Sequence, residues 1–361
     1  MNDPESELAA LLPRLVRSQR VHYLDNLRSA LIALVIFHHA ALPFGGLGSD
    51  LWMYRSPYQS AAPSRLILGA FIAVNQTYFM GTLFFLSGHF SAIAASRKSW
   101  QAFCVDKLKR LGIPVVVFSL FMQPLIRLLA GWSQHAHIWR ALLGYWAGLR
   151  GATGPVWFLA TLLCFDLVYI TIHTCLPSFA FLRPTSAARY KATAAVCIGI
   201  VIASSFSIRL SYPVGRTIPP VGVQLAYTPQ YVFAYIAGIS LSALQQYILV
   251  PHPGRALALA YLGAIATFLL TALLSRSSFH LVVGGANPLA LAYAIWNEVC
   301  FFFIGTALLS FFHESPYTTR QWGNSARYSY GAFLLHSLVV VTLQILVDRA
   351  EGRLVAWSKR S

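Results

Sequence analysis

The sequence predicts an all-α membrane protein, a polytopic bundle of about nine to ten transmembrane helices with a cytoplasmic N-terminus. Two observations carry this prediction. Hydrophobic residues make up 57% of the 361-residue chain and charged residues only 11%, whereas soluble proteins carry roughly 25% charged residues. The apolar residues are also grouped in runs of about 20, the length at which a helix crosses the hydrocarbon of a lipid bilayer. We therefore expect an integral, multi-pass membrane protein.

Nine apolar runs are long enough to be spanning helices. Clusters of proline and glycine separate them, as expected for turns. The runs lie near residues 27–44, 68–93, 111–130, 155–176, 191–209, 228–250, 256–275, 288–312 and 328–348. They divide the chain into a cytoplasmic N-terminal segment at 1–22, a membrane domain at 23–348 and a short basic tail at 349–361.

The basic residues indicate orientation. The 27 Lys and Arg residues lie between the apolar runs rather than in one polar domain, which follows the positive-inside rule and argues against a nucleic-acid partner. With the N-terminus inside, fourteen cations lie on the cytoplasmic side and eight on the other. Four tail cations, from Arg349 to Arg360, contradict this orientation after nine spans. Either one span is miscounted or a final helix is missing, and both interpretations stay open.

The first apolar run carries charged and titratable side chains that hydrocarbon disfavours. Arg28 follows Asp25, and His38 and His39 lie further along. Eleven residues at about 100° each make three turns plus roughly 20°, so Arg28 and His39 share a stripe about 16 Å long, whereas His38 is rotated away by about 80°. Imidazole acts as a general base near neutral pH. We therefore predict a catalytic role for His39; the alternative is a pair of packing histidines with a snorkelling Arg28.

The second run carries a polar stripe. Asn75, Tyr78 and Thr82 are spaced three and four residues apart, and the stripe continues to His89. Such a stripe should face a cavity or a partner helix rather than lipid. The run also contains Ser87-Gly88, a pair that is equally typical of close helix packing.

A basic loop is expected between the second and third runs. It contains Arg97, Lys98, Lys107, Lys109 and Arg110. These cations either set the topology and contact anionic lipid or bind the phosphates of a cytosolic nucleotide-like ligand. The sequence has no glycine-rich dinucleotide or ATP-binding motif.

Three further ionisable side chains lie within later apolar runs: Asp166, Glu298 and His336. Each either lines a pore or forms an internal hydrogen bond of the bundle. The five cysteines show no CxxC spacing, so no disulfide framework is expected. No metal site is expected either, because the histidines lack carboxylates or thiolates at ligand spacing.

Four motifs follow one another along the chain. They are Arg28 with ten residues before His39, Phe84-Phe-Leu-Ser87-Gly88 ahead of the basic loop, Trp157-Phe-Leu159, and Ser329-Tyr-Gly-Ala-Phe-Leu-Leu-His336. Together they resemble the acyltransferase-3 family of integral-membrane O-acyltransferases. The opening Tyr23-Leu-Asp-Asn-Leu-Arg28 looks most like the branch that contains glucan biosynthesis protein C. The family's Arg-x-x-Arg pair stands here as Lys107-x-x-Arg110.

The resemblance implies transfer of an acyl group, commonly acetyl or succinyl, from cytosolic acyl-CoA to a hydroxyl of a carbohydrate or other small acceptor. Acyl-CoA is then a co-substrate, and no permanently bound cofactor is expected. The implied roles are catalysis for His39, Arg28 and Asp25, CoA binding for Lys107, Arg110 and Ser87, and pore lining for Tyr78, His89, Trp157, His336 and Glu298.

Two other functions stay open on the sequence alone. A proton-coupled secondary transporter would use Arg28, His39, Asp166 and Glu298 as a relay. Transporters often contain inverted halves, and the sequence shows no internal repeat. The third possibility is an inactive membrane scaffold of the same fold.

Overall fold

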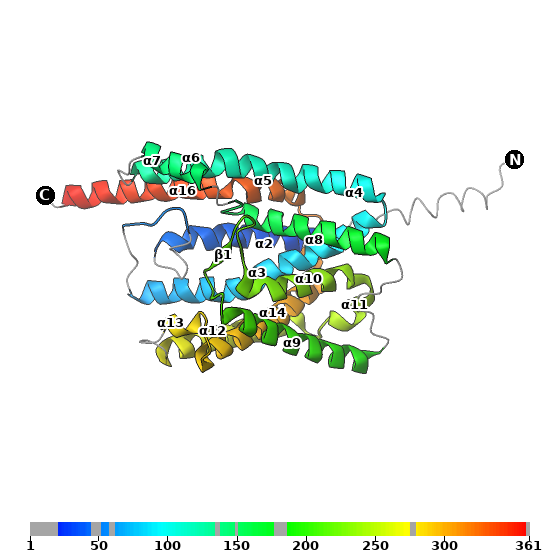
Figure 1. Ribbon diagram of the computed structural model, residues 1–361. Coiled ribbons are helices and arrows are strands. Elements are labelled where there is room, and N and C mark those ends of the chain that lie inside the picture. Colours follow the sequence, from blue (N-terminus) through cyan, green and yellow to red (C-terminus); the bar gives the residue numbers. More distant parts are fainter. Residues whose placement is uncertain are drawn as a thin grey trace.

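The computed structural model describes residues 21–44, 52–57, 62–133, 138–148, 151–176, 186–274 and 279–358. In these ranges the chain is almost entirely helical, and the long helices run along a common direction (Figure 1). The strand pair found there consists of β1 (Thr217–Ile218) and the antiparallel β2 (Val223–Gln224). The predicted segment 1–22 lies almost wholly outside the described residues.

The helical elements follow one another in chain order. They are α2 (His22–Ala41), η1 (Leu42–Phe44), α3 (Ala62–Ala95), α4 (Trp100–Lys107), η3 (Leu108–Gly112), α5 (Ile113–Val117), η4 (Phe118–Met122), α6 (Gln123–Ser133), α7 (Ile138–Ala147), α8 (Val156–Cys175), α9 (Ala187–Arg209), η5 (Leu225–Tyr227), α10 (Thr228–Ile239), α11 (Leu241–Ile248), α12 (Pro253–Leu274), α13 (Phe279–Val282), α14 (Pro288–Glu314), α15 (Pro316–Thr319) and α16 (Ser325–Ser358).

Within the described ranges, eight helices are long and apolar enough to cross a membrane. They correspond to eight of the predicted runs, which confirms an all-α, polytopic membrane protein. The remaining run, near 228–250, is divided into two helices. Ser240, at φ −87° and ψ 4°, lies outside the α-helical region, so α10 ends there and α11 begins at Leu241. With 12 residues, α10 is too short to span the bilayer alone.

The last helix is longer than the predicted run near 328–348. α16 has 34 residues and continues to Ser358, through most of the segment where a basic tail was expected. α2 begins at one end of the bundle and α16 ends at the opposite end (Figure 1). This arrangement agrees with an odd number of chain crossings.

The basic loop expected ahead of the third run is mostly helical, which corrects that prediction. The Ser99 hydroxyl accepts a hydrogen bond from the Ala102 backbone N–H at 3.4 Å and caps α4. From Trp100 to Gly131 the chain forms one candidate span. Two five-residue π-helical segments, η3 and η4, interrupt its α-helical geometry, and such segments are frequent at functional sites.

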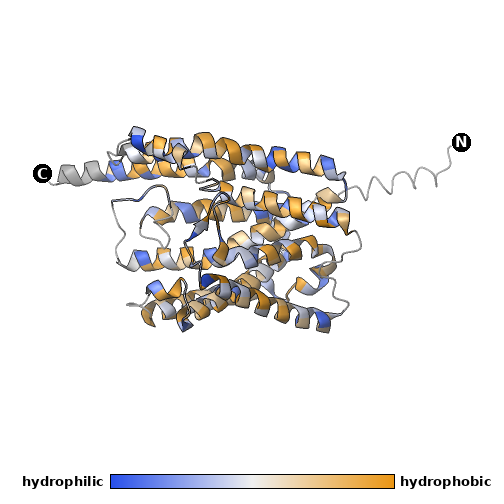
Figure 2. Ribbon diagram, in the orientation of Figure 1, coloured by the Kyte–Doolittle hydropathy of each residue, from blue (hydrophilic) through white to orange (hydrophobic). Residues whose placement is uncertain are grey.

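The bundle is apolar outside and partly polar inside. On α12, Leu259, Leu262 and Leu270 have exposed fractions of 69%, 63% and 57%, and Figure 2 shows apolar residues along all the long helices. By contrast, Asp166 and Glu298 are completely buried. This distribution suits a bundle whose surroundings are lipid and whose polar groups find partners on other helices.

α3 is the central helix and packs against α2, α8, α10, α12 and α14. Glycines bring it close to α10. A Cβ atom added to Gly88 would collide with the carbonyl oxygen of Tyr235, and one added to Gly238 would collide with the carbonyl oxygen of Phe85. Small residues at such crossings let two helix backbones approach each other. Gly88 therefore has the close-packing role that the sequence left open.

We predict that Gly88→Ala destabilises the folded protein by about 1–3 kcal/mol, because the added methyl group overpacks the crossing of α3 and α10. Gly199→Ala is the matched control, since Gly199 is also helical and an added Cβ would have no atom within 4 Å. Thermal unfolding of both variants in the same detergent measures the difference. Equal melting temperatures would contradict the close crossing.

Candidate active site

Two histidines meet where the end of α2 lies against α16. Nδ1 of His39 is 2.9 Å from Nε2 of His336, and the ring centroids are 5.0 Å apart. Nδ1 of His336 is in turn 2.6 Å from the carbonyl oxygen of Phe333, one helical turn earlier. The predicted base and one of the predicted pore-lining residues are therefore in direct contact.

The Phe333 carbonyl determines where the protons lie in the neutral rings. Because a carbonyl oxygen only accepts hydrogen bonds, Nδ1 of His336 carries a proton and its Nε2 is an acceptor. Nδ1 of His39 must then donate to that Nε2, which leaves the lone pair of His39 on its own Nε2. In the described ranges this nitrogen has no protein hydrogen-bond partner. His39 thus presents a basic nitrogen whose tautomer is held by His336.

The segment around Trp52 covers a face of the His39 ring. The indole of Trp52 stacks on the imidazole with centroids 4.5 Å apart and 13° between the ring planes. Gln344 accepts a hydrogen bond from Trp52 Nε1 at 3.1 Å and donates one to the His39 carbonyl oxygen at 3.1 Å. Tyr54 donates to Asp348 at 2.6 Å. α16 therefore positions both the partner of His39 and the aromatic ring above it.

His38 has different neighbours. Only 5% of it is exposed, and its ring stacks on Phe79 of α3 with centroids 5.0 Å apart. The His38 and His39 rings are perpendicular to each other. His39 faces α16 and His38 faces α3, which is the separation expected from their positions on one helix.

Arg28 and Asp25 lie near the other end of α2. Their side chains form an ion pair at 3.0 Å, and Arg28 also donates to the carbonyl oxygen of Ala326 at 3.3 Å. The guanidinium carbon lies 5.2 Å from the centroid of the Phe90 ring. Arg28 is thus anchored between α2, α3 and the start of α16. It forms one end of the stripe on α2 that leads to His39.

Lys107 belongs to an internal ion pair. Its ammonium is 2.8 Å from the buried carboxylate of Asp166 and donates to Ser91 at 2.7 Å. Asp166 also accepts hydrogen bonds from Ser91 at 2.5 Å and Tyr235 at 2.6 Å. Four helices, α3, α4, α8 and α10, meet at this carboxylate. Only 14% of the Lys107 side chain is exposed, so most of it is closed to a ligand.

Arg110 has the opposite environment. Its side chain is 73% exposed and pairs with Asp106 at 2.9 Å, which leaves guanidinium surface open. The Tyr330 hydroxyl donates to the Arg110 carbonyl oxygen at 2.5 Å. This contact brings the basic segment of η3 beside the first turns of α16, at the same end of the bundle as Arg28.

The other predicted residues on α3 have local partners. The Ser87 hydroxyl donates to the carbonyl oxygen of Leu83 at 2.8 Å, one turn back. Tyr78 donates to Asn75 at 3.0 Å and contacts the hydroxyl of Tyr261. Ser87 and Tyr78 therefore form polar contacts inside the bundle. In the described ranges neither side chain contacts His39.

Trp157 and His89 lie among aromatic side chains. Trp157 packs near Phe84 and Tyr231, with ring centroids 6.3 and 5.7 Å away. His89 lies beside Phe90 at 5.7 Å, next to the ring that supports Arg28. The Phe84–Gly88 and Trp157–Leu159 motifs therefore supply one aromatic cluster in the middle of the bundle.

Glu298 lies in a separate polar cluster. It accepts hydrogen bonds from Ser205, Asn297 and Gln230, each at 3.0 Å. All of these side chains are completely buried. These partners give the carboxylate a structural role between α9, α10 and α14.

Arg209 is a buried residue that sequence reasoning missed. It lies at the end of an apolar run, yet it is completely buried, with its guanidinium carbon 4.7 Å from the Tyr293 ring centroid and 5.5 Å from the Tyr227 ring centroid. Among the described residues, its three guanidinium nitrogens have no hydrogen-bond partner. Its position at the end of an apolar run is the one feature of the sequence that could have indicated its burial. The sequence analysis also missed Trp52, Gln344 and Asp348, because their contacts form only when α2 and α16 pack together.

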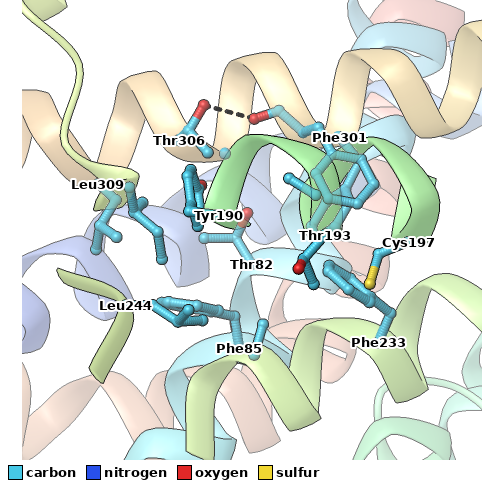
Figure 3. A pocket seen from close by; sticks show the side chains of 15 residues that line it. Thr82, Phe85, Tyr190, Thr193, Cys197, Phe233, Leu244, Phe301, Thr306 and Leu309 are labelled. Atoms are coloured by element: carbon cyan, nitrogen blue, oxygen red, sulfur yellow. Dashed lines mark hydrogen bonds between the residues drawn. The ribbon is translucent and has the colours of Figure 1, made fainter. Parts of the chain in front are cut away.

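An apolar cavity of about 100 Å³ lies away from the histidine pair, between α3, α9, α10, α11 and α14. Phe85, Phe233 and Phe301 line it, together with Tyr190 and Cys197 (Figure 3). None of the predicted site residues is among its lining residues. Among the described residues, no group of three or more His, Cys, Asp or Glu side chains is arranged to hold a metal ion.

The membrane bundle and its paired histidines define a membrane-embedded site suited to proton transfer. The profile of the acyltransferase-3 family, described as an acyltransferase domain, matches residues 21–358, and the chain belongs to this family. It is therefore an integral-membrane acyltransferase, and the transporter alternative gains no support. Comparisons with curated proteins and with solved structures find no match.

We predict that Lys107→Met destabilises the protein by about 3–5 kcal/mol, because it leaves the buried Asp166 carboxylate without its cation. The double variant Lys107→Met/Asp166→Asn should recover a large part of this loss. Lys98→Met is the control, since the Lys98–Asp106 pair is partly exposed and such pairs contribute about 0–1 kcal/mol. Thermal unfolding tests this, and a double variant no more stable than Lys107→Met alone would count against the pairing.

Proposed function

We propose that this membrane acyltransferase moves an acyl group, acetyl or succinyl, from acyl-CoA to a hydroxyl of a carbohydrate or other small acceptor. The observation that carries the proposal is the His39–His336 hydrogen bond, since it leaves one basic nitrogen of defined tautomer within the bundle. The opening Tyr23–Arg28, which resembles that of glucan biosynthesis protein C, supports a carbohydrate acceptor.

His39 acts as the general base in this reaction. Its Nε2 takes the proton of the acceptor hydroxyl while the hydroxyl oxygen attacks the thioester carbonyl carbon. A C–O bond forms and the C–S bond breaks. The departing CoA thiolate takes the proton from Nε2, so the products are an acyl ester and CoA and His39 is neutral again.

His336 is a positioning residue. When His39 is protonated, its Nδ1 continues to donate to Nε2 of His336, a neutral acceptor that adds no second positive charge. The same contact holds the ring so that Nε2 keeps one direction. Trp52 stacks on the His39 ring and limits its rotation.

The two substrates reach His39 from opposite ends of the bundle. Arg28 lies near the start of α2 and His39 near its end, about 16 Å apart along the helix axis. Phosphates of CoA do not enter hydrocarbon, so the pantetheine arm carries the thioester inward. Arg110 contributes to phosphate binding because it is exposed, whereas Lys107 stabilises Asp166. The acceptor binds near Trp52 and Tyr54, beside the outer end of α2.

We predict that His39→Ala lowers kcat by at least about 100-fold, the lower range for the loss of general-base catalysis. His38→Ala should retain most of the activity, because His38 packs on Phe79 away from α16. His336→Phe should reduce kcat by an intermediate factor. Turnover is compared in purified variants of matched folded fraction, and similar losses in the His38 and His39 variants would refute the assignment.

We also predict that acyl transfer is vectorial. In sealed vesicles of known orientation, labelled acyl-CoA should give product only from the face where α2 begins, with the acceptor on the other face. The reason is that Arg28 and Arg110 contact the first turns of α16, whereas Trp52 stacks on His39 at the far end of α2. A detergent-opened sample controls for total activity. Product formed only when both substrates share one face would contradict this route.

A further inference from the structure

A polar cavity of about 250 Å³ lies at the end of the bundle where α2 and α16 begin. Seven of its ten lining residues carry polar or charged side chains. His22 and Asn26 line it from α2, and Trp322, Asn324 and Arg327 line it from the α15–α16 connection and the first turn of α16. Of the ten lining residues, Asp25 alone was identified as functional from the sequence.

Asn26 builds one wall of this cavity. Its side-chain amide donates to the carbonyl oxygens of Thr318 and Arg320, each at 2.7 Å. Asn26 is 2% exposed, so these two bonds are protected from competition by solvent. They tie the start of α2 to the segment that leads into Trp322. The cavity is thus formed by packed elements whose relative positions are held by buried hydrogen bonds.

The charges around the cavity favour an anion. Arg327 is exposed, and no ion pair is found for it within the described ranges. Asp25 also lines the cavity, but its carboxylate is paired with Arg28 at 3.0 Å. Arg110 lies nearby, because Tyr330, three residues after Arg327, contacts its carbonyl oxygen. Arginine is the side chain best suited to bind phosphate oxygens in a bidentate manner.

We propose that this cavity binds the diphosphate of acyl-CoA, with Arg327 as its principal cation; the assignment rests on the proposed function. The volume is slightly below the roughly 300–1,000 Å³ of pockets that enclose a whole drug-sized ligand, so it suits the diphosphate better than the whole nucleotide. The diphosphate is also the part of CoA that adjoins the pantetheine arm. Asp25 and Arg28 stand between the cavity and the stripe of α2 that leads to His39.

Three acyl donors test which part of CoA the cavity recognises. They are acetyl-CoA, acetyl-3′-dephospho-CoA, which keeps the diphosphate, and acetyl-pantetheine, which lacks it. Arg327→Ala should raise KM about tenfold for the first two, the usual effect of losing one charged hydrogen bond. It should leave KM for acetyl-pantetheine and kcat for all three donors unchanged. Arg327→Lys should recover part of the affinity.

Arg320→Ala is the matched control. Arg320 lies in the connection just ahead of α16, and its guanidinium stacks on Tyr317 at 5.3 Å, outside the cavity lining. Its replacement by Ala makes the same change in net charge as Arg327→Ala. An equal rise in KM from both variants would overturn the proposal in favour of a general electrostatic effect. A KM defect confined to acetyl-CoA would assign Arg327 to the 3′-phosphate and overturn it too. A higher KM for acetyl-pantetheine in the Arg327→Ala variant would show that Arg327 stabilises the fold rather than binding the diphosphate, and would also overturn the proposal.

Calorimetric binding of free CoA to the full-length protein in nanodiscs separates this assignment from the proposed reaction. CoA should bind, and Arg327→Ala should weaken its Kd about tenfold while Arg320→Ala does not. CoA binding that depends on Arg327 without any acyl transfer would refute the proposed function and leave the cavity assigned. Acyl transfer that is indifferent to Arg327, with unchanged CoA binding, would refute the cavity and leave the function.

Discussion

Hydrocarbon offers no water to a polar side chain, and this constraint organises the interior of the bundle. Several ionisable groups there obtain their partners from another helix or from the turn before them. Asp166 pairs with Lys107 at a point where four helices meet, and Glu298 accepts three hydrogen bonds. The His39–His336 contact follows the same rule. Its outcome is chemical as well as structural. The Phe333 carbonyl and His39 engage both nitrogens of His336, and within the described residues Nε2 of His39 keeps a lone pair without a protein partner.

The fold was predictable because long apolar runs carry a strong signal. The run near 228–250 was composed like the others, yet it divides at Ser240. Composition could not predict this break, because the tight crossing of Gly238 with α3 depends on a partner far away in the sequence. The basic segment before the third run was polar enough to resemble a loop. It is helical because Ser99 caps it and because Lys107 finds Asp166 inside the bundle.

The candidate site was predictable along one helix and less so between helices. Helical spacing was sufficient to group Arg28 with His39 and to separate His38. It could not show that His336 is the partner of His39, since the two residues are 297 positions apart. For the same reason Lys107, an exposed phosphate ligand by its sequence context, is an internal cation in the structure. The cavity that Arg327 lines forms only where the α15–α16 connection packs against Asn26, a residue far away in the sequence.

α16 connects features that are otherwise far apart. Arg327, Tyr330, His336, Gln344 and Asp348 all belong to this one uninterrupted helix. His336 follows Arg327 by nine positions, and a helix fixes that interval at about 14 Å. In the proposed reaction, α16 therefore sets the distance between the cation that holds the CoA diphosphate and His336, the partner of the base that acts on the thioester. In that proposed reaction, selection among thioesters depends on the length of the carrier arm. A single residue inserted between these positions would rotate one end of α16 against the other by about 100°.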